Sequence, residues 1–379
     1  FVFLDNLKLR SSYGLNGNAG LPGSRLYQAE FGYSSSYNDY PVIYYSGTEN
    51  QSLSWEITKK FNVGLDFEVL NNRLSGTIEY FSEETQDMLL ALPLSRTKGF
   101  SSQWANVGSM KNSGIEFDFS SVNLDGDGFD TFRWSTDFNI ANVNNEVTGL
   151  AEGREEIIEG TKRITVGNHV KTYYMRKYAG VNPANGDPLW YVNGKNGKVT
   201  NDYSEAERAH QGNSLPDVTG GLTNTFSYKG VSLSFQFNFS FGYKIYDTWA
   251  GYMISDGRNN LSYNQYEKAM DRWQEPGDVT DVPEIRPGGN MQSYQTSTRY
   301  LYNADHIRLR NLSLSYDLPK SLIENYNFDK VNVFVRGTNV WTYLFNDDLE
   351  WEPETDDTGL IDFEAPVMKT YTAGVKLTF

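Results

Sequence analysis

The feature that most constrains this chain is a strict alternation of apolar and polar residues from Val231 to Phe241. Every odd position holds Val, Leu or Phe, and every even position holds Ser, Gln or Asn. Because successive side chains point to opposite faces of a strand, this pattern predicts a β-strand with one continuous apolar face. Such a strand fits either a soluble sheet packed on a core or a barrel wall that faces lipid.

Weaker alternation of the same kind recurs along the chain and predicts an all-β fold with about twelve candidate strands. Many of these strands approach the roughly 9–11 residues that a tilted strand needs to cross a membrane. The expected strands are residues 4–14, 55–70, 73–89, 106–121, 130–144, 172–180, 188–192, 217–228, 231–246, 306–317, 331–343 and 368–379.

The connections between these strands alternate in length and favour the membrane barrel over the soluble sheet. Short connections are expected at residues 71–72, 123–129, 181–187, 229–230 and 318–330. Long ones are expected at residues 15–54, 90–105, 145–171, 193–216, 247–305 and 344–367. Outer-membrane barrels have short periplasmic turns and long extracellular loops. With an even number of strands, the C-terminus at Phe379 is expected at the periplasmic rim.

One expected strand changes phase along its length. Ile307 and Leu309 belong to one face by position, whereas Leu312 and Leu314 belong to the other. A β-bulge inserts one extra residue into a strand and so restores a common face. The sequence therefore predicts a bulge near Arg310 and Asn311.

Composition excludes several other classes of protein. The chain of 379 residues has 33 Lys and Arg against 48 Asp and Glu, which gives a net charge of −15 and argues against nucleic-acid binding. With a mean hydropathy of −0.56, it has no run near the roughly 18 apolar residues of a membrane-spanning helix. It has no cysteine, so disulfides and thiolate metal sites are excluded within it.

Two acidic segments have a composition typical of cation-binding loops. Residues 125–130 have the Asp/Gly character of a calcium loop but not the EF-hand spacing, and we expect a plain turn there. Residues 345–366 hold nine carboxylates and no Lys or Arg. That segment has three possible roles: a solvated acidic loop, a contact with a basic partner, or a divalent-cation site. The weak candidate ligands for a cation are Asp347, Asp348 and Glu350. No cofactor is expected otherwise.

The expected long loops are rich in aromatic residues. Such rings stack on sugars or pack against a protein partner, but they also form loop cores and membrane-interface belts. The candidate ligand-binding residues are Tyr33, Tyr37, Tyr40, Trp249, Tyr252, Trp273 and Tyr294.

Catalytic signatures are missing from the sequence. The three histidines, His169, His210 and His306, do not have metal-ligand spacing, and there is no nucleophile-elbow, zinc-protease or phosphate-loop motif. We therefore predict that the chain is not an enzyme and has no catalytic residue.

An ordered set of short motifs resembles the SusC/RagA family of TonB-dependent outer-membrane transporters, and the similarity runs nearly from end to end. Each motif is weak alone, but their order and separation are specific. They are residues 7–14, 53–56, 62–67, 71–74, 106–116, 180–188, 216–221, 228–230, 305–311, 336–339 and 371–374.

This resemblance implies a transmembrane antiparallel β-barrel of about 22 strands with an internal plug. Residues 1–379 would then be the C-terminal portion of that barrel, about twelve strands, with the plug and first strands absent from this chain. It further implies uptake of oligosaccharides or peptides across the outer membrane of a Gram-negative bacterium. The implied partners are a SusD-like surface lipoprotein, the TonB-ExbB-ExbD complex acting through the missing N-terminal part, and outer-membrane lipid.

An alternative is a passive outer-membrane channel or surface adhesin, because about twelve strands suffice for a closed barrel. The two hypotheses differ in whether a plug precedes this segment. The ligand itself, glycan or peptide, is not determined by the sequence.

Overall fold

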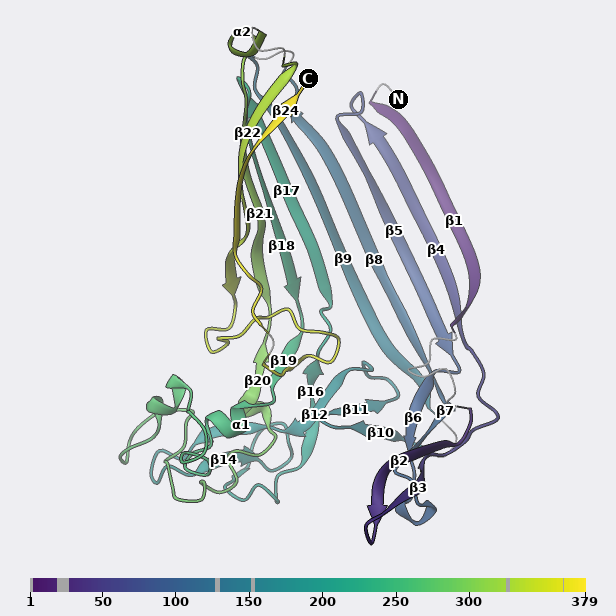
Figure 1. Ribbon diagram of the computed structural model, residues 1–379, viewed down its shortest axis with the longest axis vertical. Helices are drawn as coiled ribbons and strands as arrows, with labels where there is room; N and C mark the ends of the chain where they lie inside the picture. Colours follow the sequence, from purple (N-terminus) through teal and green to yellow (C-terminus); the bar gives the residue numbers. More distant parts are fainter. Residues whose placement is uncertain (1–2, 19–26, 127–129, 151–153, 325–327, 364) are drawn as a thin grey trace.

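The computed structural model describes residues 3–18, 27–126, 130–150, 154–324, 328–363 and 365–379. Its main feature is one long, curved antiparallel sheet of ten strands, open between β1 and β24 (Figure 1). In spatial order the strands are β1 Leu4–Asn18, β4 Glu56–Val69, β5 Leu74–Gln86, β8 Gly108–Leu124, β9 Arg133–Leu150, β17 Val218–Tyr228, β18 Val231–Phe241, β21 His306–Asp317, β22 Lys330–Leu344 and β24 Thr370–Thr378.

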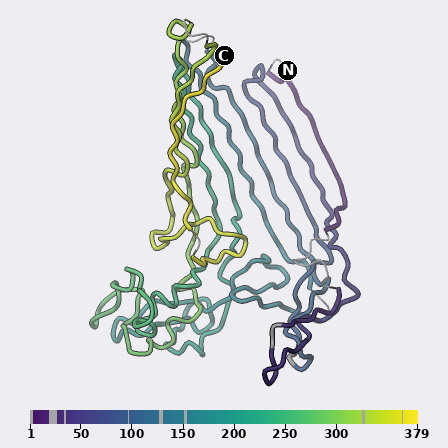
Figure 2. Tube along the Cα trace, in the orientation of Figure 1, coloured from purple at the N-terminus to yellow at the C-terminus, as the bar shows by residue number. Residues whose placement is uncertain are grey.

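The ten strands are neighbours in chain order, and the smaller elements lie in the connections between them. The Cα trace places both termini at the end of the sheet that carries the short turns (Figure 2). The long connections gather at the opposite end, so the alternation of long and short connections is confirmed for the wall. The short connection predicted at residues 181–187 is wrong, because that segment lies within the long connection between β9 and β17.

The long connections are themselves folded into small sheets and short helices. Hairpins form from β2 Glu30–Tyr37 with β3 Tyr40–Gly47, and from β6 Leu89–Pro93 with β7 Ser102–Asn106. The larger loop sheets contain β10 Glu156–Glu159, β11 Lys162–Thr165, β12 Thr172–Arg176 and β16 Arg208–Asn213; β13 Tyr178–Val181, β14 Pro188–Tyr191 and β15 Val199–Thr200; and β19 Lys244–Asp247, β20 Leu301–Asn303 and β23 Leu360–Ile361. The helices are α1 Ala250–Met253, α2 Lys320–Ile323, η1 Arg96–Lys98, η2 Glu267–Asp271 and η3 Thr298–Tyr300.

Two of the predicted wall strands are wrong. Residues 172–180 and 188–192 form β12, β13 and β14, which lie in the loop sheets and not in the wall. These strands are four or five residues long, too short to cross a membrane. Tyr173 and Met175 are buried in a loop core, so the alternation there reflects packing on other loops. The wall strands therefore number ten in place of about twelve, and the even parity is kept.

The predicted bulge is confirmed. Gln236 pairs with Asn311 and Phe237 pairs with Leu309, which leaves Arg310 unpaired between them. On the other side of β21, Leu309 pairs with Trp341 and Asn311 with Thr338, so the irregularity passes into β22. The bulge keeps Leu309 and Leu312 on the same face of the sheet.

Apolar residues cover the outer, convex face of the ten-stranded sheet, where they are exposed. Leu9 is 74% exposed, and Ile115, Leu314 and Val335 are each more than half exposed. The buried hydrophobic clusters lie mainly in the loop region, around residues such as Tyr173, Ile245 and Tyr300. No helix among the residues described combines the length and apolar character needed to span a membrane.

Close packing between neighbouring wall strands generates a stability prediction. A Cβ atom added at Gly114 would lie 2.1 Å from the backbone oxygen of Asn142 and 2.9 Å from the Phe81 ring. We expect Gly114→Ala to lower the free energy of unfolding by about 1–3 kcal/mol because the strand backbones must separate. Urea unfolding of the full-length protein in lipid vesicles measures this.

Gly14→Ala is the matched control, because a Cβ atom at Gly14 meets no atom within 4 Å. Equal unfolding midpoints for the two variants would contradict the close approach of β8 and β9 at Gly114.

Candidate functional site

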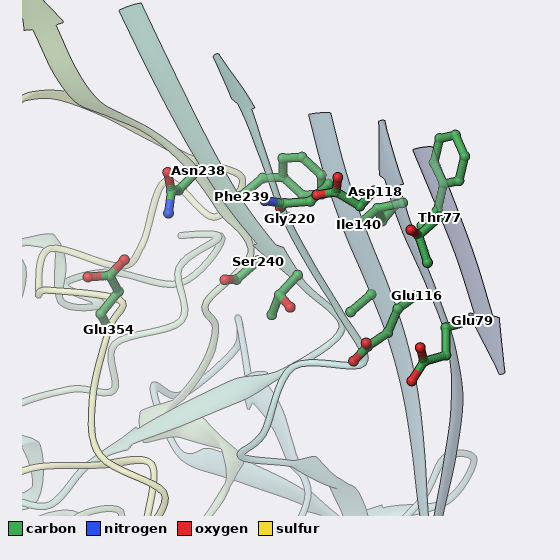
Figure 3. Close-up of a pocket in the computed structure, with 14 residues that line it drawn as sticks. Thr77, Glu79, Glu116, Asp118, Ile140, Gly220, Asn238, Phe239, Ser240 and Glu354 are labelled. Carbon is green, nitrogen blue, oxygen red and sulfur yellow. The ribbon is translucent and has the colours of Figure 1, made fainter. Parts of the chain in front are cut away.

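The concave face of the sheet is polar and forms a pocket of about 400 Å³ (Figure 3). Its charged and amide side chains come from alternate positions of the strands, and the intervening Phe117, Ile140 and Phe239 also line it. Thr77 and Glu79 are contributed by β5, Glu116 and Asp118 by β8, and Asn238 and Ser240 by β18. The alternation that gives the outer face its apolar surface therefore also gives the pocket its carboxylates.

Acidic residues dominate one wall of this pocket. Glu79 and Glu116 are direct partners across β5 and β8, an arrangement of like charges that is unfavourable unless a cation compensates it. Arg10 of β1 supplies one cation, with its guanidinium 3.0 Å from Glu79 and 2.9 Å from Asp66. A Cβ atom at Gly64 would lie 2.9 Å from the Arg10 guanidinium, so the glycine makes room for this side chain.

Glu116 and Asp118 make no ion pair with any residue in the described ranges. Their carboxylates face the pocket and are available to a cationic or hydroxyl-bearing group. The candidate site residues named from sequence do not include them. Glu116 and Asp118 alternate with the apolar Ile115, Phe117 and Phe119, and this alternation is the sequence signal that predicts the polar face for them.

The acidic connection between β22 and β24 folds back to the concave side, where Glu354 lies across the pocket from Glu79 and Glu116 (Figure 3). Glu352 pairs with Arg308, and Glu354 pairs with Arg310. The Arg308 side chain is only 3% exposed, so its charge depends on these carboxylates. This segment, residues 345–369, is called the acidic loop below.

His306 and Tyr243 complete this attachment. His306 Nε2 lies 3.5 Å from Glu354 Oε1, and the Tyr243 hydroxyl donates to the Pro353 carbonyl oxygen at 3.0 Å. His306, followed by the charges of Arg308 and Arg310, lowers the pKa of Glu354 to about 2. Glu354 is therefore ionised at neutral pH; it is hydrogen-bonded to Arg310 and lies next to Arg308 and His306.

Further basic residues hold the rest of the acidic loop. Lys171 pairs with Asp357 at 2.9 Å, and Lys268 pairs with Asp348 at 2.8 Å. Lys162 donates to Ser214 Oγ at 2.6 Å and to the Thr358 carbonyl oxygen, and its burial lowers the pKa of the amine to about 8. Four of the loop carboxylates, Asp348, Glu352, Glu354 and Asp357, are thus paired with cations of this same chain. None of the three interpretations from sequence includes this arrangement.

The weak cation ligands do not converge. Asp347 and Glu350 are exposed, and Asp348 is engaged by Lys268. Within the part of the chain that the structure describes, no group of three or more His, Asp or Glu side chains could hold a metal ion. The other acidic segment lies in the connection between β8 and β9, and its residues 127–129 fall outside the described residues.

The candidate loop aromatics occupy four different environments. Tyr33, Tyr37 and Tyr40 lie on the β2–β3 hairpin, and each is at least 72% exposed. Trp249 stacks near Tyr252 and Phe363, with ring centroids 5.4 and 4.5 Å away. These five predicted residues form two separate surface groups.

Trp273 and Tyr294 differ from the other candidates. Trp273 is 7% exposed and donates to the Pro183 carbonyl oxygen at 3.1 Å, so it is a core residue of the loop region and is not presented to a ligand here. Tyr294 is half-buried beneath the Arg258 guanidinium, 3.8 Å from the ring centroid. An aromatic residue in a long loop can pack inward or outward, and the sequence alone did not distinguish these cases.

Comparison with known proteins agrees with this architecture. Residues 1–170 match the family model described as TonB dependent receptor-like, beta-barrel. The first 170 residues are therefore similar to the β-barrel domain of TonB-dependent receptors. The chain is 28% identical to TonB-dependent receptor P3 of Formosa agariphila, over 98% of this chain and 39% of that relative. It is 26% identical to TonB-dependent receptor SusC of Bacteroides thetaiotaomicron, over 99% of this chain and 38% of SusC.

A solved structure gives the same result in three dimensions. The chain superimposes on a chain of the RagAB peptide transporter with a TM-score of 0.86 and 28% identity, over 100% of this chain and 41% of that one. The resemblance to the SusC/RagA family is therefore confirmed. The chain spans about two fifths of the length of the relatives it matches.

The buried cations behind the acidic loop generate a first prediction for this site. Glu354→Gln removes the charge that faces His306, Arg308 and Arg310, and we expect the free energy of loop opening to fall by about 1–3 kcal/mol. Hydrogen exchange of residues 350–358 in the full-length receptor should speed up at least about tenfold. Asp347→Asn, an exposed loop carboxylate, is the control, and equal exchange in both variants would contradict the attachment.

Acid should release the same loop. The pKa of Glu354 is lowered from 4.5 to about 2, so its contribution to loop attachment is complete above about pH 4.5 and is lost as the pH falls through about 2. A nitroxide attached at Thr355→Cys should gain mobility across that interval. A nitroxide at Thr97→Cys in the β6–β7 hairpin should not, and an unchanged Thr355 spectrum at pH 2 would rule out the carboxylate as the anchor.

Proposed function

We propose that this chain forms part of the wall of an outer-membrane importer of the SusC type, which takes up a nutrient in a TonB-dependent manner. The observation that carries the proposal is the ten-stranded antiparallel sheet with an exposed apolar outer face and a polar, carboxylate-lined inner face. A soluble protein rarely exposes apolar surface on this scale, whereas lipid covers it in a membrane.

The dimensions of the wall support the membrane assignment. Strand β18 has eleven residues, which span about 35 Å at roughly 3.3 Å each. A tilt of about 45° reduces this length to about 25 Å along the membrane normal, the height of the apolar band in outer-membrane barrels.

Aromatic clusters near both ends of the strands fit interfacial belts. Toward the short turns, Trp134 and Phe226 stack at 5.6 Å. Toward the long loops, Tyr343 packs against Phe345 at 5.0 Å, and Phe345 against Phe241 at 5.4 Å. In this orientation the long loops are extracellular, and the short turns and the C-terminus are periplasmic.

The edges of the sheet argue for a larger barrel. Strands β1 and β24 each have one unpaired edge, and backbone groups cannot remain unpaired in lipid. We propose that further strands of the protein complete a barrel of about 22 strands around a plug, through which the TonB-ExbB-ExbD complex delivers energy.

The proposed substrate is an oligosaccharide or a peptide, captured with a SusD-like surface lipoprotein over the extracellular loops. The similarity to SusC and to the RagAB peptide transporter supports this class. The exposed hairpin tyrosines Tyr33, Tyr37 and Tyr40, together with Trp249 and Tyr252, supply contact surface on the loops. The barrel has no proposed catalytic role; it is wall and scaffold, and no resident cofactor is proposed.

Uptake in the native bacterium tests the proposal. Deletion of the gene should abolish saturable uptake of at least one member of a panel of labelled oligosaccharides and peptides, and inactivation of TonB should abolish the same uptake. A co-purified surface lipoprotein is expected from detergent extracts of the outer membrane. Uptake that survives without TonB would identify a passive channel, and a deletion without any uptake defect would favour a surface adhesin.

A further inference from the structure

A basic surface in the loop region is not explained by the fold. The sheet formed by β10, β11, β12 and β16 lies in the loop region (Figure 1). It buries Ile157, Ile164, Tyr173 and Met175 on one face. Its other face carries Arg163, Tyr174, Arg176, Arg208 and His210, and this set is called the basic face below. In a chain with a net charge of −15, such a concentration of cations is unusual.

Two arginines of the basic face stand directly opposite each other. Arg176 of β12 and Arg208 of β16 are Cα partners in the antiparallel register, as are Tyr174 and His210. Like charges at directly opposed positions destabilise a sheet. Neither Arg176 nor Arg208 pairs with a carboxylate among the residues that the structure describes, so the repulsion is not relieved within the chain.

Stacking orients the guanidinium groups for an external ligand. Arg176 lies over the Tyr203 ring at 4.1 Å, and Arg163 over the Tyr174 ring at 4.2 Å. A stacked guanidinium keeps its in-plane N–H donors for a carboxylate. Glu156 engages Arg163. Arg208 is exposed, and His210 Nδ1 and Arg176 Nε have no hydrogen-bond partner in the structure.

The electrostatic field of this face is positive at His210. Burial lowers the pKa of His210, and the charges of Arg163 and Lys195 lower it further. Lys195 is exposed and makes no ion pair with a described residue. The basic face is therefore bordered by another free cation, and an anion placed there would be attracted by several charges together.

We propose that the basic face binds an acidic peptide, with one carboxylate side chain of the peptide received by Arg176 and Arg208 together and the next one facing His210. The spacing favours a peptide over a sugar. Arg208 and His210 are two residues apart on β16, about 6.6 Å, and alternate side chains of an extended peptide repeat at the same distance. This proposal adds a substrate chemistry to the proposed import function. It rests on that function only for the step after binding, the uptake of the peptide.

Calorimetry on the full-length receptor in detergent tests the assignment. The probe is an acetylated, amidated Glu-Ala-Glu-Ala-Glu peptide, and the matched neutral probe is Gln-Ala-Gln-Ala-Gln. We expect the acidic peptide to bind at least about tenfold more tightly than the neutral one, with an affinity that falls as salt is raised. Equal affinity for the two peptides would overturn the proposal.

Variants of the face give the second measurement. The double variant Arg176→Gln, Arg208→Gln should weaken binding of the acidic peptide by at least about tenfold, whereas Arg272→Gln, in another part of the loop region, should leave it unchanged. Arg208→Glu, a single change at an exposed position, should also weaken binding, and it is used if the double variant fails to fold. Unchanged binding in folded Arg208→Glu receptor would exclude the basic face as the site.

A titration with an acidic oligosaccharide distinguishes a peptide ligand from a sugar ligand. Tetragalacturonate that binds as tightly as the acidic peptide would overturn the peptide assignment. Calorimetry needs no TonB, so the two proposals can fail separately. Binding without TonB-dependent uptake would contradict the import function, and uptake without acidic-peptide binding would contradict the basic face.

Discussion

The structure depends on the requirement that each wall strand satisfy its backbone hydrogen bonds with its neighbours while presenting one apolar and one polar face. Where no water reaches the backbone, every N–H and C=O group must be paired within the sheet. The eight inner wall strands meet this requirement along nearly their whole length by regular antiparallel pairing, whereas β1 and β24 are paired on one side only. Period-two alternation then determines which residues face outward and which face the pocket, so Phe117 and Glu116 have different environments although they are neighbours in sequence.

Ion pairs connect the strands and the acidic loop on the concave face of the sheet, whereas apolar side chains cover the convex face. Arg10 links three strands through Asp66 and Glu79. Arg308 and Arg310, at the bulge of β21, hold the acidic loop over the pocket through Glu352 and Glu354. The bulge thus has two consequences. It restores the apolar face, and it leaves Arg310 unpaired with β18, from where the guanidinium reaches Glu354 of the acidic loop.

Much of the wall could be predicted from sequence because its pattern is local. The ten wall strands, the alternating connections and the bulge at Arg310 each follow from a repeat of two residues. The failures were at residues 172–180 and 188–192, where alternation within a short strand reflects burial against another loop. Distinguishing β12 from a wall strand requires knowing what covers Tyr173, and Tyr246, Ala250 and Tyr300 come from a distant part of the chain.

The candidate site was less predictable for the same reason. The pairing of Asp348 with Lys268, and of Glu354 with Arg310, joins segments 80 and 44 residues apart. No spacing rule connects such residues. The aromatic content of the loops indicated exposed rings such as Tyr37, but it did not distinguish them from the buried Trp273. The indole of Trp273 is hydrogen-bonded to Pro183, which is 90 residues away, so no local pattern predicts its burial.

The most direct test of the central claim is a scan of single cysteines along β18 in the full-length receptor, reconstituted in lipid vesicles. The residues of this chain include no cysteine, so each added thiol in it reports one position. A fluorophore at Phe235→Cys or Phe237→Cys should be quenched by brominated lipid, whereas Gln236→Cys and Asn238→Cys should react with a water-soluble maleimide and escape quenching. Quenching and labelling that do not alternate between odd and even positions would contradict a wall that faces lipid on one side and a polar interior on the other.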